Sequence, residues 1–394
     1  MPITSIILLL AFVLYAWLIG YYRRAWISIP LEDGPILPSN PPFISVIIPA
    51  RNEEAGIEEC LESIVSQEYL PGQFECIVVD DHSEDDTAAV VRSYAARFPF
   101  IRYINLAGEG VGVNLNAYKK KGIETGIAHS RGELIVTTDA DCRAGRNWLA
   151  GIASAYRNHD ACCLVMPVAI RKPGKGIPLR QRMLAIFQQL DVMTLQGITG
   201  ASVYRKFHGM CNGANFAYTR EVFYEVRGFT GIDHLASGDD MLLLHKISAR
   251  YPERVHYVKS PSVIIETRAE KTTGDFFNQR IRWASKSGHY PDKRVLPVLL
   301  LVYIFNLLLL INILYCVHAL IFCPENIALV TCLAVLLLKT IIELLFLIPV
   351  SRFFHQKQVL VWFPLMQVPH ILYTVIAGFL GFFGRYRWKG RRVR

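Results

Sequence analysis

Two carboxylates, one residue apart, follow a run of apolar and β-branched residues in the stretch VTTDADC at residues 136–142. The run is typical of a buried strand, and Asp139 and Asp141 stand at its end. Because side chains two residues apart in an extended chain point to the same side, both carboxylates can reach one ligand. Such a pair could bind a metal ion or another polar group, provided that the surrounding fold holds it in place.

Acidic residues also follow other apolar runs. Glu53 lies just past FISVIIPA (43–50), and Asp80 and Asp81 end FECIVVDD (74–81). One acid at such a place is usually a turn or a helix cap, which is the alternative interpretation. In open α/β sheets, however, ligands bind beyond the carboxyl ends of the strands. Acids that recur there favour a metal or polar-ligand site.

The elements that must position these acids alternate along the chain. Strands are expected at residues 43–50, 74–81, 101–107 and 133–141. Apolar residues at helical spacing follow the first strand, at Ile57, Leu61, Ile64 and Val65. Strands that alternate with helices predict an α/β fold with a mostly parallel central sheet covered on both faces.

The chain also contains four apolar runs of about the length that crosses a bilayer, at residues 3–22, 295–322, 326–350 and 359–383. Arg23 and Arg24 follow the first run, which indicates an uncleaved anchor with the next domain in the cytoplasm. The alternative is a secretory signal, but the run lacks a basic start and a small-residue cleavage site. We therefore expect a multi-pass protein of the cell (inner or plasma) membrane.

The last apolar run raises a conflict of topology. The tail GRYRWKGRRVR (384–394) holds six basic residues and no acid, so it should face the cytoplasm. A full crossing by 359–383 would place this tail outside. Pro364 and Pro369 lie within the run, so a hairpin or re-entrant segment is favoured over a full crossing.

The net charge of +9 also bears on the partners of the protein. Much of the basic excess lies in the tail and beside Arg23, next to apolar segments, where basic residues typically contact anionic lipid headgroups. No nucleic-acid-binding module is recognisable, so we expect no nucleic-acid partner. The nine cysteines show no C-x-x-C spacing and are expected to be buried apolar side chains.

Six motifs follow one another in a fixed order over roughly residues 43–290. They are PARNEE (49–54), VVDDHSEDDT (78–87), TTDADC (137–142), GANFAYTREVFYEVRGF (213–229), SGDDML (237–242) and QRIRW (279–283). Taken together, this set resembles the family 2 glycosyltransferases. That resemblance implies a nucleotide-binding fold of the GT-A type, inverting sugar transfer from a nucleotide sugar, and a divalent Mg²⁺ or Mn²⁺.

The resemblance also suggests a binding site for the nucleotide sugar. Asp81 matches the carboxylate that accepts a hydrogen bond from the nucleobase, and Ala50 and Glu53 match the rest of the nucleoside pocket. Lys119 lies where similar sequences often read G-K, although Tyr118 stands here in place of the Gly. The alternative for the lysines at 119–121 is a solvated helix face.

The same resemblance assigns the metal ligands and the general base. Asp141 is expected to be the main ligand of the cation, and Asp139 to contact the ribose or the metal through water. Asp240, the second acid of SGDDML, is expected to be the general base for the acceptor hydroxyl. Capping of a following helix is the alternative for Asp239 and Asp240.

The motif QRIRW brings together side chains suited to a diphosphate and a sugar. Arg donates bidentate hydrogen bonds to phosphate, and Trp offers a flat apolar face to a sugar ring. By resemblance, Gln279, Arg282 and Trp283 form the acceptor and diphosphate site. An interfacial helix with Arg and Trp at headgroup level is the alternative, and both interpretations can hold together.

The sequence thus predicts a membrane-embedded inverting glycosyltransferase with a lipid or glycan acceptor and a possible homo-oligomeric state. The alternatives are a processive polysaccharide synthase of the poly-N-acetylglucosamine, chitin-oligomer or hyaluronan type, and more remotely a non-catalytic membrane scaffold. The expected domains are an anchor (1–24), a linker (25–42), a cytoplasmic catalytic domain (43–270), an interfacial region (271–294), membrane segments (295–383) and a basic tail (384–394).

Overall fold

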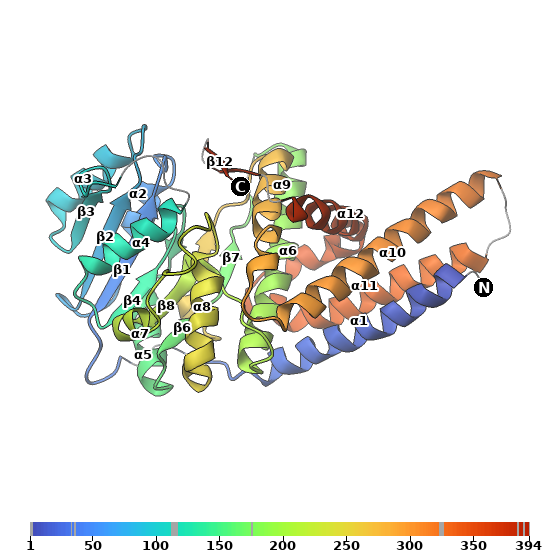
Figure 1. Cartoon of the computed structure of the whole chain (residues 1–394), viewed down its shortest axis with the longest axis horizontal. Coiled ribbons are helices and arrows are strands. Elements are labelled where there is room, and N and C mark those ends of the chain that lie inside the picture. The colour runs from blue at the N-terminus through green and yellow to red at the C-terminus, as the bar shows by residue number, and fades with distance from the viewer. Residues whose placement is uncertain are drawn as a thin grey trace. The chain divides into compact units, whose positions relative to one another are not determined.

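The computed structural model describes residues 3–393 apart from 33, 35–36, 112–116, 175, 323–326, 384–385 and 389–390 (Figure 1). The chain divides into two compact units. The sheet unit comprises Ile29–Arg171, Ser202–Ala269 and Arg387–Arg394, and the helical unit comprises Met1–Ser28, Lys172–Ala201 and Glu270–Tyr386. Residues 172–201, which fall within the range 43–270 of the expected catalytic domain, therefore group with the helical unit.

A seven-stranded sheet forms the centre of the sheet unit, in the order β3-β2-β1-β4-β8-β6-β9. Strands β3, β2, β1 and β4 run parallel to one another, while β8 runs antiparallel to both β4 and β6, and β6 is parallel to β9. The mostly parallel α/β sheet expected from the sequence is therefore confirmed. The strands are β1 (Ile44–Ala50), β2 (Phe74–Asp80), β3 (Ile101–Asn105), β4 (Leu134–Thr137), β6 (Cys163–Val165), β8 (Phe216–Thr219) and β9 (Val255–Tyr257).

Helices cover both faces of this sheet because alternate residues of β1 are apolar on both sides. Ile44, Val46 and Ile48 join one buried core with α2 and α5. Ile47 points to the other face, where a Cβ on Gly126 of α4 would lie only 2.6 Å from it, so the glycine allows close helix–sheet packing. The helices are α2 (Ile57–Val65), α3 (Thr87–Arg97), α4 (Tyr118–Ala128), α5 (Trp148–Asn158), α7 (Arg220–Glu225) and α8 (Asp239–Arg250).

A small second sheet in the order β5-β10-β7 adjoins the end of β4. Strand β10 (Ile265–Thr267) pairs antiparallel with β5 (Arg143–Ala144) and parallel with β7 (Val168–Ile170). Because β5 begins two residues after Asp141, this sheet fixes the chain that leaves the D-A-D segment. Short helical turns complete the unit at η1 (Gly213–Asn215), η2 (Pro252–Arg254) and η3 (Pro261–Val263).

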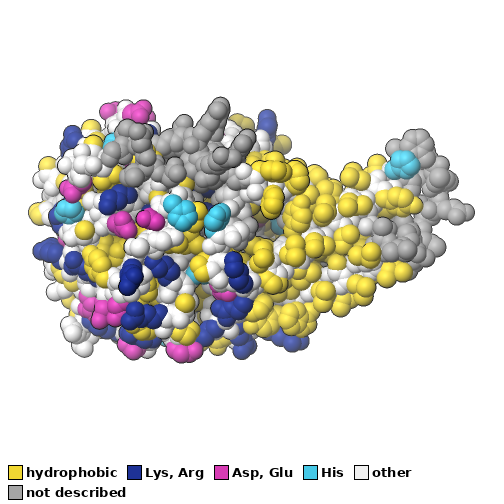
Figure 2. Space-filling model, viewed as in Figure 1, with side chains coloured by type: hydrophobic (Ala, Val, Ile, Leu, Met, Phe, Trp, Pro, Cys, Tyr) yellow, Lys and Arg dark blue, Asp and Glu magenta, His cyan; other side chains and the backbone are white. Residues whose placement is uncertain are grey.

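Among its described residues, the helical unit contains four helices long and apolar enough to cross a membrane, at Ser5–Ser28, Val295–His318, Leu329–Phe353 and Lys357–Phe382. Figure 2 shows apolar side chains crowding the visible surface of its long helices. Its elements are α1 (Ile3–Ser28), α6 (Leu179–Tyr204, whose last three residues fall in the sheet unit), α9 (Thr273–Ala284), η4 (Ser287–His289), α10 (Val295–Phe322), α11 (Ile327–Phe353), η5 (Lys357–Trp362) and α12 (Phe363–Phe382).

A polar cluster joins three of these helices. Lys339 and Glu343 of α11 form an ion pair of 2.8 Å, and Gln367 of α12 accepts a hydrogen bond of 2.6 Å from Lys339. Tyr15 of α1 donates a hydrogen bond to Glu343. All four side chains are buried. Because their charges and hydrogen bonds satisfy one another, the cluster is suited to holding α1, α11 and α12 in register within an apolar surrounding.

The expected hairpin at residues 359–383 is not found. Over Phe363–Phe382 the chain forms one uninterrupted helix, α12, preceded by η5. Pro364 stands in the first turn, where a missing N–H costs nothing, and Pro369 is tolerated inside the helix. The prolines therefore do not reverse the chain. The tail continues as the paired strands β11 (Tyr386–Trp388) and β12 (Arg391–Val393), while its residues 384–385, 389–390 and 394 lie outside the described residues.

Candidate functional site

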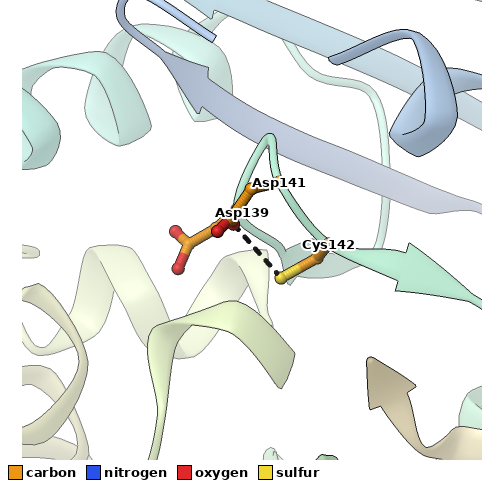
Figure 3. Close-up of side chains that lie close together, drawn as sticks. All are labelled: Asp139, Asp141 and Cys142. Carbon is orange, nitrogen blue, oxygen red and sulfur yellow. Dashed lines mark hydrogen bonds between the residues drawn. The ribbon is translucent and has the colours of Figure 1, made fainter. Parts of the chain in front are cut away.

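The D-A-D segment turns immediately after β4 and gathers three potential ligand groups (Figure 3). One ligand atom from each of Asp139, Asp141 and Cys142 lies within 4.8 Å of the others. The Cys142 thiol lies 3.7 Å from Asp141 Oδ1, and its burial, followed by the charges of Asp141 and Asp139, raises its pKa well above the ordinary value. Two carboxylates at this distance suit a hard divalent cation.

Two elements hold Asp141. Thr267 of β10 donates a hydrogen bond of 3.2 Å from its hydroxyl to Asp141 Oδ2. Gly56, just before α2, packs against the same residue, since a Cβ there would lie 3.3 Å from Asp141 Cα. The small sheet and the start of α2 therefore fix the second carboxylate of the motif. Thr267 was not expected from the sequence, because it lies more than one hundred residues from Asp141 along the chain.

The α4 residue Lys119 connects the D-A-D segment to the SGDD segment. Its ammonium lies 2.7 Å from Asp139 Oδ1 and 3.3 Å from Asp239 Oδ2. Burial alone would lower the pKa of Lys119, but Asp139 and Asp239 outweigh it, so the pKa is raised and the side chain stays charged. Lys119 therefore does not lie on a solvated helix face, in contrast to that alternative.

The neighbouring Lys120 is also buried, with 2% of its surface exposed. Its ammonium donates hydrogen bonds to the backbone carbonyls of Ile232, Leu235 and Ser237. These carbonyls belong to the loop that leads into Asp239. Lys121 is the member of the lysine cluster that is exposed. The sequence could not distinguish the three, because their partners come from distant segments.

Asp239 and Asp240 occupy the first turn of α8, after Gly238 at φ +83°. Asp240 Oδ2 accepts a hydrogen bond of 3.0 Å from the backbone N–H of Gly213, and Oδ1 accepts one of 2.7 Å from Met241. A Cβ on Gly213 would lie 3.2 Å from Asp239 Oδ2 and 3.5 Å from Lys119 Nζ. The glycine of the motif GANF thus lets the backbone approach the acids. Four carboxylates and Lys119 are brought together.

The expected nucleoside residues lie at the ends of β1 and β2. The N–H of Asp81 donates to the carbonyl of Ala50 at 2.8 Å, and Asp81 Oδ1 contacts His82 Nδ1 at 3.0 Å. The backbone N–H of Glu53 donates to the Thr87 hydroxyl at 2.8 Å. Ala50, Glu53 and Asp81 therefore gather at one edge of the sheet.

Asp80 has a different role from its neighbour Asp81. It accepts hydrogen bonds of 2.8 Å from the Tyr103 hydroxyl and 3.1 Å from the Ser83 N–H. These contacts hold the ends of β2 and β3 together, so Asp80 is structural. His82, at φ +53°, has its Nε2 atom 3.1 Å from the Val111 carbonyl oxygen, to which an Nε2–H donates, and His82 was not singled out from the sequence.

The residues of QRIRW lie on α9, which belongs to the helical unit. Gln279 donates a hydrogen bond of 2.9 Å to Glu270 Oε1. Arg280, which the sequence did not single out, forms a buried ion pair of 2.6 Å with Asp191 of α6 and lies over the Trp283 ring at 4.1 Å. Arg282 and Trp283 are partly exposed. The motif thus contains one buried arginine and one accessible arginine.

Part of the chain matches a known protein family. Residues 45–227, which contain the D-A-D segment and GANF, match the family Glycosyl transferase family 2. This segment of the chain is a family 2 glycosyltransferase domain. The resemblance inferred from the motifs is confirmed at this level.

Among curated relatives, this glycosyltransferase is 28% identical over 292 residues to an N-acetylglucosaminyltransferase of Rhizobium meliloti, covering 69% of this chain and 63% of the relative. It is 24% identical over 183 residues to a beta-monoglucosyldiacylglycerol synthase of Trichormus variabilis, covering 44% of this chain and 38% of the relative. The chain spans about half the length of the curated relatives that it matches.

Among solved structures, the chain is similar to the mannosyltransferase PcManGT from Pyrobaculum calidifontis, determined in complex with GDP-Man and Mn²⁺. The TM-score is 0.55 at 21% identity, and the match covers 95% of this chain and 98% of that one. This likeness supports the GT-A-type fold of the glycosyltransferase, together with its additional helices.

Proposed function

We propose that this protein is a membrane-embedded inverting glycosyltransferase that moves a sugar from a nucleotide sugar to a hydroxyl group of a lipid or glycan acceptor. The observation that carries the proposal is the convergence of Asp139, Asp141, Asp239 and Asp240 around Lys119 beyond the end of β4. A family 2 domain with an intact set of acids at this edge is suited to sugar transfer. A non-catalytic scaffold would have no need for such a concentration of charge.

Each group at the edge has a proposed task in donor binding. Ala50, Glu53 and Asp81 hold the nucleoside, with Asp81 accepting a hydrogen bond from the base. Asp139 contacts the ribose, and Lys119, whose ammonium lies 2.7 Å from Asp139 Oδ1, donates to a diphosphate oxygen. A divalent Mg²⁺ or Mn²⁺ held by Asp141, with Asp139, would neutralise the charge that develops on the departing diphosphate.

Asp240 is the proposed general base. It takes the proton of the acceptor hydroxyl while that oxygen attacks the anomeric carbon, and the bond from that carbon to the diphosphate oxygen breaks. The acceptor gains the sugar, the nucleoside diphosphate leaves with the bonding electrons, and the proton stays on Asp240. One displacement inverts the anomeric configuration. The hydrogen bond from the Gly213 N–H supports this task because it fixes the orientation of the Asp240 carboxylate.

The acceptor is proposed to be a membrane lipid. Gln279, Arg282 and Trp283 form the proposed acceptor and diphosphate site, and the four apolar helices would place the enzyme in the cell (inner or plasma) membrane with its sheet unit in the cytoplasm. The relative from Trichormus variabilis is a beta-monoglucosyldiacylglycerol synthase, whose name denotes a lipid product, and this supports the choice. A polymer channel needs enough helices to enclose it, so the four described helices favour a lipid acceptor over a growing polymer. A processive polysaccharide synthase is the second candidate, favoured by QRIRW.

Incubation of membranes that contain the protein with labelled nucleotide sugars tests the proposal. UDP-sugars are the first choice, with GDP-sugars alongside them, in the presence of Mn²⁺ or Mg²⁺. A labelled product that extracts into organic solvent supports lipid glycosylation. A high-mass product that a glycosidase degrades supports the polysaccharide synthase instead. No incorporation from any donor, in membranes where the protein is folded and abundant, contradicts sugar transfer.

A further inference from the structure

The ammonium of Lys119 contacts a carboxylate oxygen that a bound cation would also use. Its Nζ atom is 2.7 Å from Oδ1 of Asp139, a carboxylate of the candidate cation site, and 3.3 Å from Oδ2 of Asp239. The Lys119 side chain is 20% exposed, that of Asp139 35% and that of Asp239 8%, so water screens the contact with Asp239 less than the contact with Asp139. Lys119 is therefore the internal counterion of Asp139 when no other cation is present.

This placement creates a conflict with a divalent ion. A cation bound to Asp139 would stand beside the ammonium, and two positive charges at such a distance repel strongly where water is scarce. Lys119 would have to leave Asp139 or the ion would have to bind mainly through Asp141. The Oδ2 atom of Asp141 accepts a hydrogen bond from the hydroxyl of Thr267.

A nucleotide sugar would remove the conflict, because its diphosphate brings two negative charges to the same edge. An ammonium released from Asp139 could then donate to a diphosphate oxygen while keeping Asp239 as its second partner. The helix position of Lys119 permits this change, since the next residue, Lys120, is anchored separately to the carbonyls of Ile232, Leu235 and Ser237. The backbone of α4 thus stays fixed while the Lys119 side chain changes partner.

We propose that Lys119 occupies the cation-binding edge of the empty enzyme and moves to the donor diphosphate when cation and nucleotide bind together. Lys119 then weakens binding of the cation alone and strengthens binding of the cation with the nucleotide. Cation and nucleotide affinity become coupled through one side chain, and the coupling is reciprocal. This inference deepens the proposed function and rests on it.

Mn²⁺ binding to the purified full-length protein in detergent tests the inference, with the free Mn²⁺ signal read by electron paramagnetic resonance. The dissociation constant is measured without nucleotide and with UDP or GDP. In Lys119→Met, which keeps the length of the side chain and removes its charge, Mn²⁺ alone should bind about tenfold more tightly than in the wild type. The gain in Mn²⁺ affinity on adding nucleotide should shrink by a similar factor.

Two further variants separate charge from shape. Lys119→Arg keeps the positive charge and should bind Mn²⁺ alone as weakly as the wild type. Lys121→Met removes a charge from an exposed residue of the same helix, where Lys121 lies 3.9 Å from Glu124, and should leave both Mn²⁺ affinities unchanged. If Lys119→Met does not fold, as judged by thermal unfolding, Lys119→Gln takes its place with the same expectation.

The inference is overturned if the neutral variant binds Mn²⁺ alone no more tightly than the wild type while its response to nucleotide is unchanged. Failure of the proposed function has a different signature. In that case the wild-type protein itself binds neither UDP nor GDP in the presence of Mn²⁺. If the wild type binds nucleotide and transfers sugar but Lys119→Met has wild-type Mn²⁺ affinities, only the role of Lys119 is wrong.

Discussion

The ammonium of Lys120 donates a hydrogen bond of 3.0 Å to the backbone carbonyl of Ser237, two residues before Asp239. The same ammonium also binds the carbonyls of Ile232 and Leu235. Breaking these hydrogen bonds would leave buried polar groups without partners, which costs free energy of folding. Lys120 therefore fixes the loop from which Asp239 and Asp240 enter α8.

Replacing Lys120 by Met should loosen that loop and leave three carbonyls without their donor. We expect the free energy of unfolding to fall by about 3 kcal/mol, because buried acceptors lose their partner. The turnover number should fall at least about tenfold, since the general base loses its fixed position. Chemical denaturation and steady-state kinetics measure the two effects. Lys121→Met is the matched control, and equal effects in both variants would contradict a specific role for Lys120.

Thr267 should control the cation affinity of the neighbouring carboxylate. Its hydroxyl donates to Asp141 Oδ2 at 3.2 Å, so Thr267→Val removes a bond that orients a proposed ligand. Loss of such an orienting partner typically lowers metal affinity about 10- to 100-fold. Titration with Mn²⁺ would show this. Thr267→Ser retains the hydroxyl and should recover most of the affinity, whereas equal affinities in Thr267→Val and the wild type would exclude the orienting role.

The buried ion pair of Arg280 and Asp191 should hold the Trp283 ring in its position. Arg280 is 4% exposed, pairs with Asp191 at 2.6 Å and lies 4.1 Å from the Trp283 ring centre. Arg280→Met leaves Asp191 buried without its countercharge, at a cost of about 3–5 kcal/mol. The KM for the acceptor should rise more than the KM for the donor, because the indole loses its neighbour.

A double variant tests this account of the pair. Arg280→Met combined with Asp191→Leu removes both charges, so the two losses of stability should not add. A double variant that loses the sum of the two single losses would show that Arg280 and Asp191 act independently.

Glu59 of α2 should contribute to stability at low pH. Hydrogen bonds from Arg171 and then Arg268 lower its pKa from the ordinary value of 4.5 to about 2. A carboxylate with a lowered pKa in the folded state stabilises the fold above its unfolded pKa, and this contribution is lost as the pH falls. Between about pH 4.5 and 2, stability should therefore fall less steeply in Glu59→Gln than in the wild type. Denaturation curves at pH 5 and pH 3 measure this. An equal loss of unfolding free energy between the two pH values in the wild type and in Glu59→Gln would contradict the prediction.

The sequence predicted the sheet because each strand leaves a local pattern. The run at 44–50 is apolar on both faces, and that pattern is typical of a parallel strand between two layers of helices. Asp139 and Asp141 could be found in the same way, since they follow the strand signal, whereas Asp240 was found through the resemblance of the motif SGDDML. Contacts across the fold leave no such pattern, which is why Thr267, Lys120 and Arg280 were missed.

The error at residues 359–383 has a local cause. Two prolines and the positive tail suggested a reversal, but a proline in the first turn of a helix carries no penalty. Pro364 takes that position, and Pro369 follows with the helix unbroken. The two prolines were therefore wrongly interpreted as the sign of a hairpin. The apolar character of the segment was predicted correctly.

The central claim is that the acids at the end of β4 and the start of α8 form one site for sugar transfer with Asp240 as the base. The most direct test measures transfer of labelled sugar from a nucleotide sugar by purified wild-type protein and by Asp240→Asn, which is nearly the same in shape. The account predicts that the variant folds and binds nucleotide with Mn²⁺ but transfers sugar about 10²- to 10⁴-fold more slowly. Transfer by Asp240→Asn at the wild-type rate would contradict it.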